Sequence, residues 1–379
     1  MGLSQIMVVT GEVSGDQHAA DLVSQLKKRL PDARFFGMGG ARLADQGVDL
    51  IYSANEISVM GITEVLPKLR RIARVMKGLE RSAAHRQPLV AILVDIPDFN
   101  LRLARRLKRL SIPVAYYVSP MIWAWRRGRI ETIAGCVDEM LCILPFEEAI
   151  YRRAGVPARY VGNPVLDQLP PPADREVFRR NLGLDPQRPV LALLPGSRIS
   201  EIERILPAMV GAAKELSAER PGLQVAIPVA PSVPPEEIRS RFSGSGVEPV
   251  LMAGRAPEVV GASDAAVVAS GTAVLEAGLM QRPFVVVYRV AALSYLVGRL
   301  LVRVPHIGLV NLLLGRRVVP ELLQGAMTAQ RIAAEVRRIW SPGPDQDRIL
   351  SGLAELRATL GPAGAASRAA QEIVSLLRA

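Results

Sequence analysis

The chain has 379 residues, more than one ordinary hydrophobic core accommodates, so two domains are expected. Hydrophobic residues make up 49% and charged residues 22%, a balance that excludes an intrinsically disordered chain. The formal net charge of +11 favours an anionic partner, such as nucleic acid, acidic lipid or a phosphorylated substrate. The two cysteines, Cys136 and Cys142, lack metal-ligand spacing, which is typical of packing residues in a reducing compartment.

The N-terminal residues do not predict a signal for export, and the most apolar stretch does not predict a membrane span. Residues 1–6 lack the basic segment and the cleavage site of a signal peptide. The most apolar region, residues 290–314, is interrupted by Arg299, Arg303 and Pro305, whereas a span needs about 20 apolar residues. We therefore expect a cytoplasmic protein that lies on a membrane surface without crossing the membrane.

The first half of the chain alternates apolar runs with helical patterns. The runs predict strands at residues 5–10, 34–37, 89–94, 114–118, 139–144 and 158–161. The turn after the first strand contains neither G-x-G-x-x-G nor G-K-[ST], so neither a dinucleotide fingerprint nor a P-loop is expected there. Glu12 follows the first of these strands and Asp95 follows the run at 89–94, so both should project from one edge of a parallel sheet. A partly desolvated carboxylate at this edge is either a general base or a helix cap.

A basic amphipathic helix is predicted over residues 62–79. Its apolar positions recur at helical spacing, and no acidic residue occurs between Leu66 and Leu79. This pattern is typical of a helix on a membrane surface, but it also fits a core-facing helix with a solvated basic face. The lipid-contact residues expected on the first reading are Val65, Leu66, Leu69, Ile72 and Met76.

A loop dense in tryptophan and arginine follows the run at 114–118 and extends from Ser119 to Arg127. Such a loop either grips a ligand or a lipid headgroup, or packs between domains. A proline-rich stretch, Leu169-Pro170-Pro171-Pro172, then marks a linker.

After the linker the pattern restarts, with strands predicted at 190–194, 224–228, 250–251, 265–268 and 284–287. Strands that alternate with helices, twice over, predict two parallel-sheet α/β domains. Ligands in such folds bind beyond the carboxyl ends of the strands, so the cleft between the two domains is the expected active site.

Two turns in the second half have the composition of anion-binding sites. Gly196, Ser197 and Arg198 join a buried strand to a helix that we expect to open with a capping box at Ser200–Glu203. Ser270, Gly271 and Thr272 stand at a second strand–helix turn, and Glu276 follows one helical turn later. The two turns together suggest a diphosphate, with Glu276 either on a ribose diol or simply a polar helix residue. Asp345-Gln346-Asp347 matches the D-x-D pattern of metal-dependent transferases, but helix capping accounts for it and no metal is expected.

These motifs, in this order, resemble the lipid-A-disaccharide synthases, inverting glycosyltransferases of the two-domain GT-B fold. The segments that carry the resemblance in the first half are Gly11-Glu12-Val13-Ser14-Gly15-Asp16, Val59-Met60-Gly61-Ile62-Thr63-Glu64-Val65-Leu66, Asp95-Ile96-Pro97-Asp98-Phe99-Asn100, Tyr117-Val118-Ser119-Pro120 with Trp123-Ala124-Trp125-Arg126, and Leu144-Pro145-Phe146-Glu147. Those in the second half are Leu194-Pro195-Gly196-Ser197-Arg198, Ala269-Ser270-Gly271-Thr272-Ala273 with Leu275-Glu276, Asn311-Leu312-Leu313, and Pro320-Glu321-Leu322-Leu323-Gln324.

The resemblance implies a reaction and roles for the residues. It implies transfer from UDP-2,3-diacylglucosamine to 2,3-diacylglucosamine 1-phosphate (lipid X), which forms a β-1,6-linked disaccharide phosphate and UDP without a metal or other cofactor. Asp95 is then the base for the acceptor hydroxyl, and Arg198 neutralises phosphate charge. Glu12 and Asn311 match further functional positions, and Ser270, Gly271, Thr272 and Glu276 match the UDP-binding segment. The chain departs from the family pattern at Val310, where proline is usual, so the role of Asn311 is left open.

The expected organisation is therefore an α/β, GT-B chain of two Rossmann-like domains. Residues 1–165 form the acceptor and lipid side, residues 166–345 bind the UDP-sugar, and the helices of 346–379 cross back to an N-terminal domain. The expected partners are the two acylated substrates and the cytoplasmic surface of the inner membrane, with no nucleic acid and with a homodimer as a possibility. The alternatives are another GT-B UDP-sugar enzyme, either a 2-epimerase or a peptidoglycan-type transferase, and a non-catalytic protein that binds nucleic acid or lipid through its basic surface.

Overall fold

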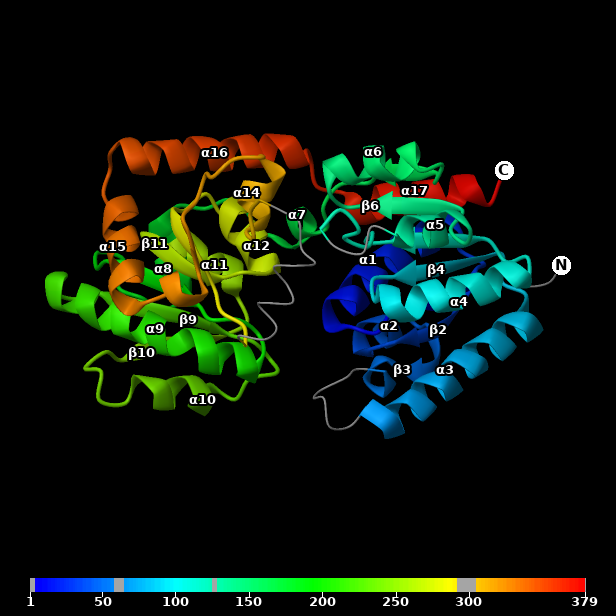
Figure 1. Ribbon diagram of the computed structural model, residues 1–379, viewed down its shortest axis with the longest axis horizontal. Coiled ribbons are helices and arrows are strands. Elements are labelled where there is room, and N and C mark those ends of the chain that lie inside the picture. Colours follow the sequence, from blue (N-terminus) through cyan, green and yellow to red (C-terminus); the bar gives the residue numbers. More distant parts are fainter. Residues whose placement is uncertain (1–3, 58–64, 125–127, 292–304, 379) are drawn as a thin grey trace. The chain divides into compact units, whose positions relative to one another are not determined.

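The computed structural model describes residues 4–57, 65–124, 128–291 and 305–378. The chain divides into two compact units, of which the first comprises Met1–Asp167 with Pro362–Ala379 and the second comprises Gln168–Gly361. Figure 1 shows α17, in red, among the elements of the first unit and α16, in orange, among those of the second. Each unit is described by itself below.

The first unit is a parallel sheet of seven strands in the order β3-β2-β1-β4-β5-β6-β7. The strands are β1 (Gln5–Val9), β2 (Arg34–Gly39), β3 (Asp49–Ser53), β4 (Val90–Val94), β5 (Val114–Tyr117), β6 (Glu139–Cys142) and β7 (Ala158–Tyr160). The helices are α1 (Val13–Arg29), α2 (Ala41–Asp45), α3 (Val65–Arg86), α4 (Pro97–Arg109), α5 (Arg129–Ala134), α6 (Pro145–Arg153), α7 (Val165–Gln168) and α17 (Ala365–Leu376).

Alternate residues of these strands belong to two separate cores, as a pleated strand requires. Met7, Val9 and Leu93 pack with α3 and α4 on one face of the sheet. Ile6 and Val8 pack with α1 and α17 on the other face. Because both faces are covered, the strands read as unbroken apolar runs, which is why the sequence predicts most of them.

The second unit is a parallel sheet of six strands in the order β10-β9-β8-β11-β12-β13. The strands are β8 (Val190–Leu194), β9 (Gln224–Val229), β10 (Pro249–Ala253), β11 (Ala265–Ala269), β12 (Phe284–Tyr288) and β13 (Glu321–Leu323). The helices are α8 (Arg175–Asn181), α9 (Ile199–Glu219), α10 (Pro235–Arg239), α11 (Ala256–Ala262), α12 (Thr272–Leu279), α14 (Leu309–Leu313), α15 (Ala329–Trp340) and α16 (Pro344–Leu360).

Two strands, β3 and β13, are absent from the sequence-based expectation. Each lies at an edge of its sheet and pairs with a single neighbour, β2 and β12 respectively. Most of the residues of β3 and β13 are only half-buried. An edge strand of this kind has no continuous apolar run, so composition does not distinguish it from a loop.

The last two helices belong to different units, whereas the expectation was that residues 346–379 cross back together. On α16, Leu353 and Leu356 are buried, and the methyl groups of their side chains lie over Gly278 on α12 in the second unit. Only α17 packs on α1, and it buries Ile373 and Val374 in the core of the first unit. Asp167, at the end of the first long segment, accepts hydrogen bonds from the backbone N–H groups of Gly364 and Ala365 and so caps α17.

In the described part of the chain, no helix is both long enough and apolar enough to span a membrane.

Candidate functional site

The carboxyl edge of the first sheet carries Asp95 in a strained backbone conformation. Asp95 and Ile96 have φ values of 54° and 39°, in the left-handed region, which costs about 1–3 kcal/mol per residue. The Asp95 carbonyl accepts hydrogen bonds from Asn100 Nδ2 at 2.8 Å and from the Tyr116 hydroxyl at 2.5 Å. Its N–H donates to the Tyr117 carbonyl at 3.1 Å. These bonds hold the strained turn, and with it the direction of the Asp95 side chain.

The surroundings of Asp95 make it a stronger base than an ordinary aspartate. Burial, and to a smaller extent the negative charge of Glu12, raise the pKa of Asp95 to about 6, although a hydrogen bond from the Ile96 N–H lowers it. A carboxylate with this pKa remains mostly ionised at neutral pH and accepts a proton more readily than a carboxylate with an ordinary pKa. Glu12 is exposed and immediately precedes α1 as its N-cap residue.

Two other carboxylates on this edge have structural partners. Asp16 is buried and accepts hydrogen bonds from the backbone N–H groups of Gly40 and Arg42, at 2.7 and 2.9 Å, which holds the start of α2. Asp98 forms an ion pair with Arg129. Asp95 and Glu12 are therefore the better candidates for chemistry. Neither Asn100 nor Tyr116 is among the site residues predicted from the sequence. Asn100 could have been identified as a polar residue in the first turn of a helix, within the Asp95–Asn100 motif.

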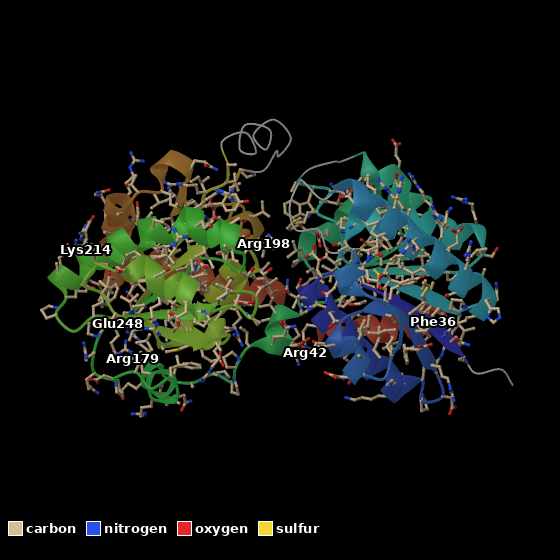
Figure 2. All side chains as sticks on the ribbon, turned by 90° about the horizontal axis from the view of Figure 1, so that it is seen from below. Phe36, Arg42, Arg179, Arg198, Lys214 and Glu248 are labelled. Carbon is tan, nitrogen blue, oxygen red and sulfur yellow. The ribbon has the colours of Figure 1, made fainter. Side chains whose placement is uncertain are left out.

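In the second unit, the Gly196–Arg198 turn joins β8 to α9. Gly196 has a φ of 114°, and a Cβ there would lie 2.5 Å from the Glu201 carboxylate, so glycine is required. Arg198 is the N-cap residue of α9, and its side chain is 71% exposed. Figure 2 shows Arg198 at one end of α9, with Lys214 farther along the same helix.

The N-cap residue of α9 is Arg198, two residues before the expected Ser200. Ser200 lies inside α9, so the predicted capping box at Ser200–Glu203 is wrong. Glu201 instead accepts a hydrogen bond from the Ser197 N–H at 3.2 Å and pairs with Arg198 at 3.1 Å. An exposed pair of this kind contributes at most about 1 kcal/mol, so a phosphate can compete with Glu201 for the Arg198 guanidinium.

The second anion-type turn lies on the neighbouring strand. β8 and β11 are hydrogen-bonded neighbours, so the turns that follow them share one edge of the sheet. The Ser270 hydroxyl donates to the Ile307 carbonyl at 3.3 Å, while Gly271 and Thr272 are exposed at the start of α12. One turn into α12, burial and the nearby Glu258 raise the pKa of Glu276. The fold thus places Gly196–Arg198 beside Ser270–Thr272, which leaves backbone N–H groups of two helix starts available to an anion.

Asn311 is a buried clamp, and its expected place among the catalytic residues stays a prediction. It is fully buried, and its Oδ1 accepts from the N–H groups of Val318 and Val319 at 2.7 and 2.9 Å. Its Nδ2 donates to the Val319 carbonyl at 2.9 Å and to Glu321 at 2.8 Å. All four of its hydrogen-bonding positions are used within the protein, which gives Asn311 a structural role in this unit. Glu321 in turn accepts from two backbone N–H groups just before α14.

The amphipathic helix exposes less apolar surface than expected. Of the predicted lipid contacts on α3, Leu69 is 51% exposed, whereas Ile72 is partly buried against the core. Met76 is 4% exposed and packs in that core with Val75, so its assignment to the lipid-contact surface is corrected. The side chains of Val65 and Leu66 lie outside the described residues, as do residues 62–64 of the predicted helix.

The described residues contain no group of three His, Cys, Asp or Glu side chains that could hold a metal ion. Asp345, the first residue of the D-x-D pattern, pairs with Arg338 and Arg348 at the start of α16.

Each unit is a doubly wound parallel sheet whose candidate residues follow the carboxyl ends of the strands, and two such units in one chain are the GT-B fold. The chain superposes on UDP-GlcNAc 2-epimerase from Neisseria meningitidis, bound to UDP-GlcNAc, with a TM-score of 0.64, 12% identity and 99% of each chain covered. It superposes on MurG from Acinetobacter baumannii with a TM-score of 0.58, 12% identity, and 100% of this chain and 99% of that chain covered. At these identities the likeness shows the fold alone.

Sequence comparison narrows the class to one family. The family model described as lipid-A-disaccharide synthetase matches residues 6–345. Lipid-A-disaccharide synthase from Myxococcus xanthus (strain DK1622) is 67% identical over 373 residues, which are 98% of this chain and 97% of the relative. The chain therefore belongs to the lipid-A-disaccharide synthase family, glycosyltransferases of the GT-B fold.

Proposed function

We propose that the chain joins UDP-2,3-diacylglucosamine to 2,3-diacylglucosamine 1-phosphate and releases UDP and a β-1,6-linked disaccharide 1-phosphate. The observation that carries this assignment, in a chain of this family, is Asp95: a carboxylate on a strained, firmly held turn with a pKa raised to about 6. A base of this strength suits an acceptor hydroxyl that must lose its proton as it attacks.

In the proposed step, Asp95 takes the proton of the acceptor 6-hydroxyl as its oxygen attacks C1 of the donor sugar. The bond from C1 to the UDP oxygen breaks with inversion, and UDP leaves with the bonding electron pair. Arg198 and the N–H groups at the starts of α9 and α12 stabilise the negative charge that develops on the diphosphate. These groups supply positive charge without a metal ion. Glu12 lies close enough to raise the pKa of Asp95, and this is the role that we assign to it.

UDP binding is assigned to the carboxyl edge of the second sheet. Gly196, Ser197 and Arg198 contact the diphosphate together with Ser270, Gly271 and Thr272, which their neighbouring strands bring to the same edge. Glu276, in the first turns of α12, accepts hydrogen bonds from the ribose hydroxyls.

A peripheral position on the cytoplasmic face of the inner membrane is part of the same proposal. Both substrates carry acyl chains, so the enzyme must reach a lipid surface. Leu69 exposes an apolar side chain on α3, next to the exposed Arg70 and Arg71. The formal charge of +11 favours an anionic surface. The expected homodimer stays a prediction, which light scattering of the purified chain tests.

The test is disaccharide formation from the two acylated substrates by the purified chain in excess EDTA. We expect equimolar disaccharide phosphate and UDP, and an Asp95→Asn variant supplies the control for background reaction. A parallel incubation with UDP-GlcNAc alone should return it unchanged, whereas its conversion to the 2-epimer would favour the epimerase alternative. A folded chain that binds UDP and makes no product, with or without Mg²⁺, would contradict the substrate assignment.

A further inference from the structure

The loop that follows β5, residues 118–124, is fastened to α6 through one buried carboxylate. Glu147 is 1% exposed. Its two oxygens accept hydrogen bonds from the Ser119 hydroxyl at 2.6 Å, the Trp123 indole N–H at 2.9 Å and the Leu144 N–H at 3.1 Å. The first two donors belong to the loop, and the third belongs to the residue that precedes α6.

Further contacts from α6 hold the same loop. The Tyr151 hydroxyl donates to the Pro120 carbonyl at 2.7 Å. The Trp123 ring meets Phe146 edge-on, with ring centroids 5.1 Å apart. A buried carboxylate is costly, and an apolar residue of similar size would fill the same space. What only the carboxylate provides is a common acceptor for Ser119 and Trp123, which lie four residues apart in the loop.

The loop begins beside Asp95. β5 is the neighbour of β4, and the Asp95 N–H donates to the carbonyl of Tyr117, the last residue before the loop. Val118 then has a φ of 65°, which turns the chain out of the sheet. Met121, at the middle of the loop, is 49% exposed although it is apolar. The loop therefore starts at the sheet edge that carries Asp95 and is held to α6 by hydrogen bonds and by the contact of two aromatic rings. Its apolar residue Met121 is left exposed.

We propose that Glu147 is a positioning residue: it holds residues 118–124 in the shape that forms a wall of the acceptor-sugar site beside Asp95, with Met121 turned toward an acyl chain of the acceptor. The inference rests on the proposed function for the identity of the acceptor. The fastening of the loop by Glu147 rests only on contacts within the first unit.

The central variant is Glu147→Gln, which keeps the size of the side chain. Its single carbonyl oxygen serves at most two of the three donors, and its NH₂ group faces a third. The matched control is Glu148→Gln on the same helix. Glu148 accepts a hydrogen bond from the N–H of Tyr160 on β7 at 2.7 Å and pairs with Arg152 on α6, so neither of these partners belongs to the loop. Assays run at pH 8, because burial raises the pKa of Glu147 to about 7 and its ionised form is the one of interest.

We expect Glu147→Gln to raise the KM for the acceptor by about tenfold and to leave the KM for the UDP-sugar within about twofold. Glu148→Gln should behave as wild type in both. Trp123→Phe removes the indole N–H and keeps an aromatic ring, so it should raise the acceptor KM on its own. The double variant should fall short of the product of the two single effects, because both act through one contact. Unchanged acceptor KM in both single variants would overturn the proposal.

A second readout does not depend on turnover. Hydrogen exchange at the amides of residues 118–124 should speed up by about tenfold in Glu147→Gln, while the amides of β1 and β4 keep their wild-type protection. Faster exchange throughout the first unit would mean that Glu147 only stabilises the fold, and would overturn the positioning role. If wild type forms no disaccharide, the proposed function fails, and the exchange measurement still decides whether Glu147 holds the loop.

Discussion

Asp95 shows how a single residue depends on partners that are distant in sequence. Its turn is strained, and the groups that hold it, Asn100 and Tyr116, come from α4 and from β5. Its proton affinity is set by burial and by Glu12 at the end of another strand. The basicity of Asp95 therefore depends on the ends of three strands, β1, β4 and β5, which lie at one edge of the sheet.

Replacing Asp95 by Asn should lower kcat/KM by about 10²- to 10⁴-fold, because the group that takes the proton is gone. In wild type, kcat/KM should fall as the pH drops below about 6, where Asp95 becomes protonated. Because the pKa of Asp95 is raised from 3.8 to about 6 in the folded state, stability is lost as the pH rises from about 3.8 to about 6, and the loss is complete above that range. Asp95→Asn should then unfold at the same or a higher urea concentration, with a larger gain at pH 8 than at pH 5. Wild-type turnover by the variant would remove Asp95 as the base.

Asn311→Ala should lower the free energy of unfolding by about 2–4 kcal/mol, because it leaves buried N–H and C=O groups without partners. Urea denaturation of the variant against wild type measures this loss. Whatever activity the folded fraction retains should have wild-type KM values. A variant of normal stability with no activity would favour the predicted catalytic role of Asn311.

At the scale of the element, α3 shows why amphipathic spacing alone does not assign a surface. The 3.6-residue period places Leu69, Ile72 and Met76 on one side of the helix. Along that side, however, burial increases toward the C-terminal end of the helix. Exposure falls from 51% at Leu69 to 4% at Met76. The core-facing interpretation therefore holds for Val75 and Met76, whereas the membrane-surface interpretation stays a prediction that depends on Leu69.

Leu69→Ser should weaken binding to vesicles of anionic phospholipid by about five- to thirtyfold, because one exposed leucine contributes about 1–2 kcal/mol to burial in an apolar phase. Co-sedimentation with vesicles measures the effect. Leu89→Ser is the matched control, since Leu89 is 47% exposed but lies beyond the end of α3. Equal binding by wild type and both variants would place the membrane contact elsewhere than Leu69.

For the whole molecule, the decisive feature is that the chain returns to its first unit at the end. α17 completes one face of the first sheet, and Asp167 caps it from the end of the opening segment. The first unit therefore cannot form its complete core until the last residues are present.

Ile373→Ala should destabilise the first unit by about 2–4 kcal/mol, because Ile373 is fully buried against α1 and the sheet. The second unit should be unaffected, since no residue of α17 belongs to it. Limited proteolysis with mass spectrometry should reveal earlier cleavage within residues 4–167 and unchanged resistance within 168–361. Equal loss of resistance in both units would show that they unfold as one.

Local patterns in the chain were sufficient for the alternation of strands and helices, for the position of the two strand–helix turns at Gly196–Arg198 and Ser270–Thr272, and for the carboxyl edge on which Asp95 lies. These features depend on apolar runs, on glycine at turns such as Gly196 and on strand direction, all of which act over a few residues. The edge strands β3 and β13, the clamp at Asn311, the burial of Met76 and the separation of α16 from α17 depended on the folded chain. Each of these is set by which distant segments meet, because burial and long-range hydrogen bonds have no signature in the spacing of neighbouring residues.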